Sequence, residues 1–173
     1  EEYIEGSSLS EYLKEGTFEP FEAARIVRDL CCILNELHTL ECPIIHRDIK
    51  PSNVMLTKSG EVVLLDMNVA KWYDSEEKED TRLLGTKDYA APEQAGYGMK
   101  ASSDKTDIYA VGILLNVMLT GKLPKEKPAQ GKLWDIIERC ISLDADTRYS
   151  ADELIERLDN YLGENTNAGK KDR

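Results

Sequence analysis

Apolar residues recur every three or four positions over several stretches of the chain, a spacing that gives a helix one buried face. The clearest stretch follows Pro20, and its apolar positions are Ala24, Val27, Cys31, Leu34 and Leu37. Residues 104–119 are apolar on most sides, which predicts a buried helix that ends near Gly121 and Pro124. Another helix is expected over residues 133–143.

Two more helices carry a start signal. Ser8 with Glu11, and Ser150 with Glu153, have the spacing of a capping box, in which the two side chains satisfy each other's free backbone N–H groups. The first of these helices is expected to pass through Leu13 and to end at Gly16, and the second to run to about residue 162. Residues 163–173 are polar and have no apolar period, which predicts a disordered tail.

Between the helical stretches the pattern changes to short runs rich in β-forming residues. Val54–Thr57 and residues 61–65 are two such runs, separated by Lys58-Ser59-Gly60, and they predict a hairpin. Residues 1–4 suggest the end of a further strand, and residues 66–100 have no period and predict a long loop. The fold class expected is therefore α+β, predominantly helical, with a small β-hairpin.

Composition narrows the class of protein. A chain of 173 residues is long enough for one domain with a core. Its net charge of −11 argues against nucleic acid or an anionic membrane as a partner. The charge either serves solubility or favours basic peptide substrates. The sequence contains no run of 18 apolar residues, so no membrane span is predicted.

The cysteines indicate the compartment. They are Cys31, Cys32, Cys42 and Cys140. None belongs to a Cys-x-x-Cys pair, so a zinc site is not expected. Cys31 lies in the apolar stripe of a helix and is expected to act as a small core residue. These features predict a reducing, cytoplasmic location.

The most specific pattern is the run His46-Arg47-Asp48-Ile49-Lys50-Pro51-Ser52-Asn53. It resembles the catalytic loop H-R-D-x-K-P-x-N of eukaryotic-type serine/threonine protein kinases. The resemblance implies that Asp48 accepts the hydrogen bond of the substrate hydroxyl and acts as the base. Lys50 would offset the charge of the transferring phosphate. The alternative, a polar loop that uses Asp and Asn only to form turns, requires the whole match to be accidental.

Eighteen residues after Asp48, the run Asp66-Met67-Asn68 stands where the family has Asp-Phe-Gly. The resemblance implies that Asp66 and Asn53 hold Mg²⁺, because the hairpin carries Asn53 before its first strand and Asp66 after its second. Magnesium is usually held by few protein oxygens together with phosphates. Met67 stands where the family has Phe, so the position stays apolar. Asn68 stands where the family has Gly, and Asn is the next-best residue after Gly for a left-handed backbone.

The run from Gly85 to Glu93 resembles the end of a kinase activation segment, G-T-x-x-Y-x-A-P-E. In the family, Thr86 would hydrogen-bond near Asp48 and Lys50, which is typical of Ser/Thr kinases. Glu93 would form a buried ion pair with Arg148. The alternative for Arg148 is a surface charge beside a helix.

Two further roles follow from the resemblance. Asp107, at the start of the 104–119 helix, would brace the backbone of the catalytic loop, although the helix dipole alone also favours a carboxylate there. Thr81 lies where kinases are phosphorylated, and Arg47 could pair with its phosphate. The alternative is that Thr81 is a solvated loop residue, and the acidic neighbours Glu79 and Asp80 would oppose added negative charge.

The first six residues resemble the segment that joins the two lobes of a kinase. There the adenine of ATP would bond to backbone groups of Glu2 and Ile4, and Met55 would lie beneath its ring. The expected domain is therefore the hinge and C-terminal lobe over residues 1–162. An N-terminal lobe, with its Gly-rich loop, strand lysine and partner glutamate, is expected as the missing partner.

The function implied is transfer of the γ-phosphate of ATP to Ser or Thr hydroxyls of a protein substrate, with Mg²⁺. The isolated chain is expected to be inactive without the N-terminal lobe, since phosphoryl transfer depends on positioning and charge stabilisation. The alternative is a non-catalytic, pseudokinase-like binding lobe. Asn68 and the missing lobe support this alternative, whereas the presence of Asp48, Lys50 and Asn53 opposes it.

Overall fold

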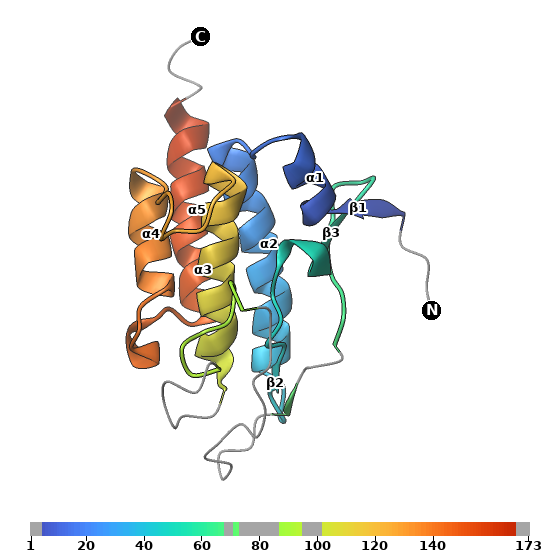
Figure 1. Cartoon of the computed structure of the whole chain (residues 1–173), viewed down its shortest axis with the longest axis vertical. Helices are drawn as coiled ribbons and strands as arrows, with labels where there is room; N and C mark the ends of the chain where they lie inside the picture. The colour runs from blue at the N-terminus through green and yellow to red at the C-terminus, as the bar shows by residue number, and fades with distance from the viewer. Residues whose placement is uncertain (1–4, 68–70, 73–86, 95–101, 169–173) are drawn as a thin grey trace.

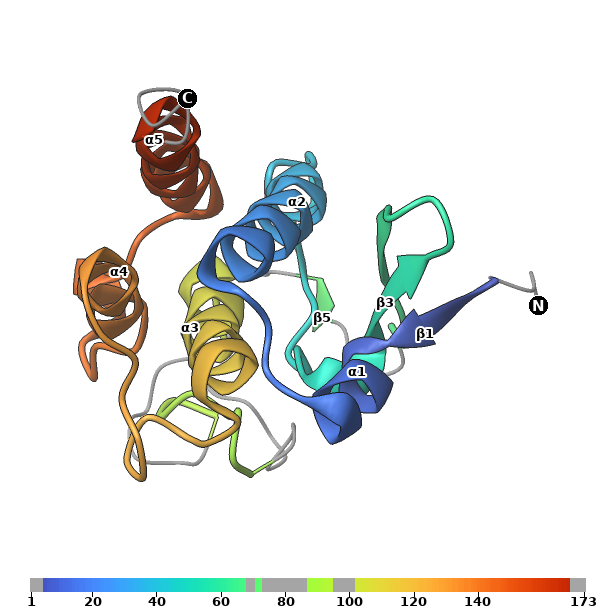
Figure 2. The same cartoon turned by 90° about the horizontal axis from the view of Figure 1, so that it is seen from above.

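Long helices lie side by side on one side of the molecule, and a small antiparallel sheet with one short helix lies beside them (Figures 1 and 2). The computed structural model describes residues 5–67, 71–72, 87–94 and 102–168. The helices are α1 (Leu9–Glu15), α2 (Pro20–His38), α3 (Asp104–Thr120), α4 (Lys132–Cys140) and α5 (Ala151–Ala168). This mostly helical arrangement with a small sheet confirms the coarse fold class.

Both predicted capping boxes are present. At the start of α1 the Glu11 amide donates to Ser8 Oγ at 3.3 Å, and the Ser8 amide donates to Glu11 Oε2 at 2.7 Å. Before α5 the Ser150 amide donates to Glu153 Oε2 at 2.8 Å, with the reciprocal bond at 3.4 Å. Gly16 ends α1, as predicted.

The predicted hairpin is also present. Strands β3 (Val54–Thr57) and β4 (Val62–Leu64) pair antiparallel, and β1 (Gly6–Ser8) pairs with the other edge of β3. β1 requires a glycine, because a Cβ on Gly6 would lie 2.2 Å from the Leu56 carbonyl oxygen. The hairpin register places Val54 opposite Leu64.

The prediction of an unbroken loop over residues 66–100 is wrong at one place. Strand β5 (Lys71–Trp72) pairs antiparallel with β2 (Ile44–Ile45), which directly precedes the catalytic loop. Strands of two residues show no alternation of apolar and polar positions. Their pairing is therefore decided by tertiary contact rather than by a local pattern.

Two predicted helix ends need correction. α4 ends at Cys140 rather than near residue 143, and the side chain of Leu143 is 81% exposed, so this apolar residue adds nothing to the core face. α5 continues to Ala168, whereas residues 163–173 were expected to be disordered. The Asn165 amide donates to the Tyr161 carbonyl at 2.7 Å, and Lys132 pairs with Glu164 at 2.5 Å. These polar contacts support the extra turn without any apolar period, and residues 169–173 lie outside the described part.

The core is built where α2 packs along α5 and α3 packs against α4. Its fully buried side chains include Ile26, Leu30 and Leu34 of α2, Ile108, Leu114 and Met118 of α3, and Leu154 and Leu158 of α5. Among the helices of the described residues, none is both long and apolar enough to cross a membrane.

Close approach of α3 to α4 depends on Gly112. A Cβ at this position would lie 2.6 Å from Cys140 Cβ and 2.8 Å from Ile141 Cγ2. We therefore expect Gly112→Ala to lower the free energy of unfolding by about 1–3 kcal/mol, because the two helices must move apart. Urea unfolding measures the change.

Gly163 is the matched control, since a Cβ added there meets nothing within 4 Å. Gly163→Ala should stabilise α5 by about 0.5–1 kcal/mol through helix propensity alone. Equal effects of the two substitutions would contradict the close approach at Gly112.

Candidate functional site

The catalytic-loop motif connects β2 to β3, and its backbone is held by a buried carboxylate of α3. Asp107 is fully buried, and its Oδ2 accepts from the His46 amide at 2.9 Å while its Oδ1 accepts from the Arg47 amide at 2.8 Å. Charged acceptors make stronger hydrogen bonds than neutral ones. Asp107 therefore fixes the two residues that precede Asp48.

Two polar side chains of the motif, those of Lys50 and Asn53, meet at Asp48. Lys50 Nζ lies 2.6 Å from Asp48 Oδ2. Asn53 Nδ2 donates to the same Oδ2 at 3.1 Å and to the Asp48 carbonyl at 2.9 Å. The carboxylate thus has a fixed orientation and a cation beside it, which is an arrangement able to accept a proton while a neighbouring charge is offset.

The end of the hairpin meets the same loop. The Leu65 amide donates to the Asn53 carbonyl at 2.8 Å, and His46 Nε2 donates to the Leu65 carbonyl at 3.0 Å. His46 Nδ1 then accepts from the Asp48 amide at 3.3 Å, which is consistent with a hydrogen on Nε2. Asp66 directly follows Leu65, so the chain brings it to the end of the hairpin where Asn53 lies.

Two non-glycine residues of the site have a left-handed backbone. The φ angle is 67° at Arg47 and 63° at Asp66. Such conformations cost of order 1–3 kcal/mol each for residues with a side chain, and they persist where the surroundings over-determine them. Here the bonds of Asp107 and Leu65 supply that constraint on either side of Asp48.

The two oxygen ligands available here, from Asn53 and Asp66, suit Mg²⁺. They are too few for a metal ion that is coordinated by protein side chains alone. Because Asn53 uses its amide nitrogen on Asp48, its Oδ1 is the atom suited to a cation, and Asp66 adds a carboxylate. Within the described ranges no group of three or more His, Cys, Asp or Glu side chains could hold a metal ion. Magnesium commonly binds through one or two protein oxygens, with water and phosphate completing the shell.

Glu93 and Arg148 form the expected buried pair. Arg148 Nη1 lies 2.7 Å from Glu93 Oε1, and Nη2 lies 3.0 Å from Oε2, so the contact is bidentate. Arg148 is 1% exposed and also donates to the carbonyls of Lys105 and Ser142. The alternative, that Arg148 is a surface charge, is therefore wrong. Thr106 Oγ1 adds a further bond to Glu93 Oε1 at 2.9 Å.

This pair makes stability depend on pH. Burial by itself raises the pKa of Glu93, but the hydrogen bonds and charge of Arg148, together with the Thr106 hydroxyl, leave the pKa below its ordinary value. A carboxyl whose pKa falls on folding stabilises the fold above its unfolded pKa, about 4.3, and loses that effect as pH falls through the folded pKa.

We therefore expect the free energy of unfolding to fall as pH drops below about 4.3, with part of this fall due to Glu93. Urea unfolding of the protein and of Glu93→Gln across pH 3–7 measures that part. Identical pH profiles for the two proteins would contradict the assignment.

Two contributing residues carried no recognised signal in the sequence. His38, at the end of α2, places Nε2 2.8 Å from Asp107 Oδ2, and both side chains are buried. Gln94 donates to the Arg47 carbonyl at 2.8 Å and accepts from the Ala91 amide at 2.9 Å. Gln94 directly follows the motif that ends at Glu93, and this position is the signal that could have found it, whereas His38 adjoins no motif.

His38 must donate to Asp107, because an ionised carboxylate only accepts. Its other ring nitrogen, Nδ1, is buried and has no hydrogen-bond partner among the described residues. We expect His38→Phe to lower the free energy of unfolding by about 1–3 kcal/mol, since it removes one donor from a buried carboxylate. His38→Gln, which retains an N–H donor, should recover part of the loss in the same thermal-melt series, and equal losses would contradict this role.

Several predicted residues cannot be placed. Glu2, Ile4, Thr81 and Thr86 lie outside the described residues, as does Asn68. Met55 is half-buried in β3, the central strand of the sheet, between Ser8 and Val63. Met67 is 43% exposed.

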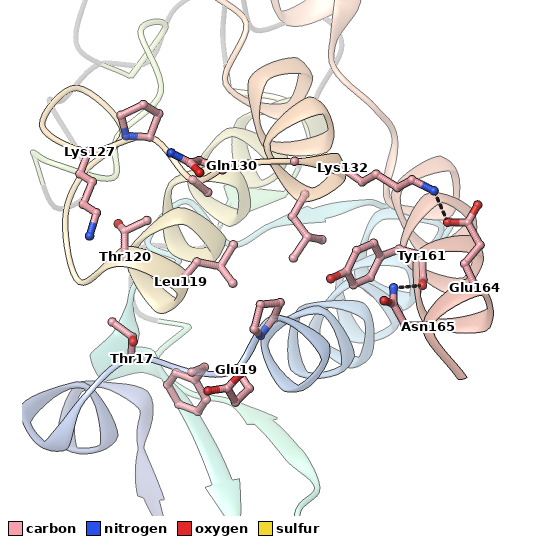
Figure 3. A pocket seen from close by; sticks show the side chains of 16 residues that line it. Thr17, Glu19, Leu119, Thr120, Lys127, Gln130, Lys132, Tyr161, Glu164 and Asn165 are labelled. Atoms are coloured by element: carbon pink, nitrogen blue, oxygen red, sulfur yellow. Dashed lines mark hydrogen bonds and ion pairs between the residues drawn. The ribbon is translucent and has the colours of Figure 1, made fainter. Parts of the chain in front are cut away.

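A cavity of about 740 Å³ lies away from the catalytic loop, between the ends of the helices (Figure 3). Leu119 and Tyr161 project into it from α3 and α5, and the ion pair of Lys132 with Glu164 lies at its edge. Of the residues predicted from the motifs, none that the structure describes lines this cavity.

Comparison with known proteins gives consistent matches. Residues 1–158 match the family model described as protein kinase domain. The chain is 37% identical over 129 residues to the probable serine/threonine-protein kinase PknB of Corynebacterium glutamicum, covering 72% of this chain and 19% of that protein. It is 37% identical over 125 residues to serine/threonine-protein kinase PrkC of Bacillus subtilis, covering 71% and 19%.

A plant protein is similar over more of the chain. Mitogen-activated protein kinase kinase 1 of Arabidopsis thaliana is 30% identical over 188 residues, which covers 90% of this chain and 51% of that protein. The chain thus spans about a fifth of the length of the two bacterial relatives and about half of the plant relative.

Proposed function

Because the chain belongs to the protein kinase family, we propose that it is the catalytic-loop-bearing part of a serine/threonine protein kinase. The reaction would be transfer of the γ-phosphate of ATP to a Ser or Thr hydroxyl of a protein substrate. The observation that carries the proposal is the meeting of Lys50 and Asn53 at the Asp48 carboxylate, on a loop braced by Asp107.

Each residue of this cluster has a distinct role. Asp48 would accept the hydrogen bond of the substrate hydroxyl and take its proton, and the bond from Asn53 keeps Oδ2 in place for this. Lys50 would turn from Asp48 toward the transferring phosphate and offset its charge. Asn53 Oδ1 and the Asp66 carboxylate would hold Mg²⁺, which when bound neutralises charge on the phosphates.

The proposal also includes the residues predicted to bind adenine, to support Asp48 and to be phosphorylated. Thr86 would hydrogen-bond beside Asp48 and Lys50, backbone groups of Glu2 and Ile4 would bind adenine, and Met55 would lie beneath its ring. Thr81 would be the regulatory phosphosite, paired with Arg47. We also propose that this part acts with an N-terminal kinase lobe, because no Gly-rich loop occurs within these 173 residues.

A cytoplasmic location is proposed on the state of the thiols. All four cysteines are free, and Cys31 and Cys140 are buried. Burial raises the pKa of both thiols, that of Cys140 to about 12. Such thiols are inert core residues and suit a reducing compartment.

The test of the function is a transfer assay on the whole protein that contains this chain. Purified protein is incubated with Mg²⁺, γ-labelled ATP and a generic protein substrate, with and without a chelator. We expect Mg²⁺-dependent label on Ser and Thr. Label absent under all conditions, with ATP binding retained, would instead favour the non-catalytic binding lobe.

A further inference from the structure

A second, more apolar groove lies next to the segment that leads into Glu93. Its volume is about 480 Å³, and it lies between residues 87–90, α3, the connection after α3, and α4. Its apolar lining residues are Ala90, Tyr109, Ile113, Leu123, Pro124, Trp134 and Ile141, and its charged ones are Lys87, Asp88 and Lys125. Figure 2 shows the segment 87–94 and the connection after α3 on the same side of α3.

The walls of this groove are held in place without a ligand. Asn116, buried in α3, donates to the carbonyls of Lys122 and Lys127 at 2.8 and 3.0 Å, and its Oδ1 accepts from the Ala129 amide at 2.8 Å. The Leu123 amide donates to Glu126 at 3.2 Å. A wall fixed in this way lowers the ordering cost that a bound segment would otherwise meet.

The groove is locally basic on an acidic chain. The charged residues that line it are two lysines, Lys87 and Lys125, against one carboxylate, Asp88. Among the described residues, Lys87 and Lys125 have no ion-pair partner. At physiological ionic strength charges beyond about 8 Å are screened, so these lysines, rather than the net charge of −11, set the preference of the groove.

The groove is also connected to the catalytic loop. Ala90 lines it, the next residue, Ala91, donates its amide to Gln94 Oε1, and Gln94 Nε2 donates to the Arg47 carbonyl. A segment bound in the groove therefore lies beside residues 90–94, which contact the backbone next to Asp48 through Gln94.

We propose that this groove docks a segment of the protein substrate in which an apolar side chain is flanked by acidic residues. The apolar side chain would fill the space between Ile113 and Trp134, and the flanking carboxylates would pair with Lys87 and Lys125. The inference rests on the proposed function, because the docked segment belongs to a kinase substrate.

The larger cavity of Figure 3 offers no such preference. Its rim carries Glu19 and Glu164 as well as Lys127 and Lys132, and Lys132 already pairs with Glu164. Because two carboxylates balance two lysines there, this rim selects neither an acidic nor a basic segment.

Binding is tested apart from catalysis, with the whole protein carrying Asp48→Asn and no ATP. The probe is a fluorescein-labelled peptide in which a Leu-Ile pair is flanked by glutamates on both sides, and its counterpart has lysines in place of the glutamates. Fluorescence anisotropy gives Kd. The emission of Trp134, taken as the difference between this protein and its Trp134→Phe variant, reports whether the probe sits in the groove, since Trp134 lines it.

We expect saturable binding of the acidic probe, a shift of Trp134 emission, and weakening as salt is added. Lys87→Glu with Lys125→Glu should raise Kd by about tenfold or more. Lys14→Glu, on the exposed surface of α1, should leave Kd within about twofold. Equal binding of the lysine probe, or binding that survives the double reversal, would overturn the proposal.

The catalytic arm uses unchanged Asp48 and a Ser peptide with or without the acidic, apolar segment. Lys125→Glu should raise KM for the peptide with the segment and leave kcat unchanged, while KM for the peptide without it stays the same. Sedimentation of the protein alone completes the test. Dimers that Lys125→Glu dissolves would show that a second copy occupies the groove, and would also overturn the proposal.

Discussion

The Asp48→Asn variant is expected to transfer phosphate about 10²- to 10⁴-fold more slowly than the unchanged protein. An amide cannot take the proton of the substrate hydroxyl, and it also removes the charge that Lys50 contacts at 2.6 Å. Because the hydrogen bond from Asn53 reaches the Asp48 carbonyl as well, the loop should keep its shape.

The measurement is the initial rate of Mg²⁺-dependent transfer at saturating ATP, beside thermal melting. Asp135→Asn is the matched control, since Asp135 is an exposed carboxylate on α4, remote from the catalytic-loop motif in the sequence. It should transfer phosphate at the unchanged rate. A rate for Asp48→Asn within about threefold of the unchanged protein would contradict the role of Asp48 as base.

The second large effect is expected on stability. Arg148→Met should lower the free energy of unfolding by about 3–5 kcal/mol, because it leaves the buried carboxylate of Glu93 without its bidentate partner. It also leaves two carbonyl oxygens, those of Lys105 and Ser142, without the donor they have now.

Arg139→Ala is the control for losing an arginine near the same region. Arg139 is exposed, its guanidinium carbon lies 4.2 Å from the Tyr149 ring centroid, and it donates to the Thr147 carbonyl. Its replacement should cost about 1 kcal/mol or less. Urea unfolding compares the two variants.

A double variant distinguishes two contributions to the lost stability. One is the loss of the ion pair, and the other is the cost of leaving one buried charge without a partner. Glu93→Gln with Arg148→Met should be less destabilised than the sum of the single variants, because no buried charge is left alone. Strictly additive losses, or an Arg148→Met protein as stable as Arg139→Ala, would contradict the buried-pair account.

The sequence by itself determined the features that depend on neighbours along the chain. The helix of Pro20–His38 follows from apolar positions three or four residues apart, and the capping box of Ser8 follows from a spacing of three. The hairpin follows likewise from two β-rich runs separated by three turn residues, whereas the roles of Asp48, Lys50 and Asn53 were expected from the resemblance to the kinase catalytic loop. Short-range geometry leaves a readable pattern in the sequence.

The pair of Glu93 and Arg148 joins distant residues, and yet the sequence predicted it through a family motif. The residues lie 55 positions apart, and their pairing was expected from the order of family motifs rather than from a period or spacing. The structure adds what the resemblance did not contain, namely the complete burial of Arg148 and its further bonds to backbone carbonyls.

Only the tertiary structure decided the contacts between distant residues that no motif includes. His38 meets Asp107 across 69 positions, Gln94 reaches the Arg47 carbonyl across 47, and β5 pairs with β2 through two residues on each side. Likewise α5 runs to Ala168 on polar side-chain contacts, among them the pair of Lys132 with Glu164. Each of these contacts depends on how helices and strands pack. Packing is set by the combined burial of many side chains rather than by any local run of residues.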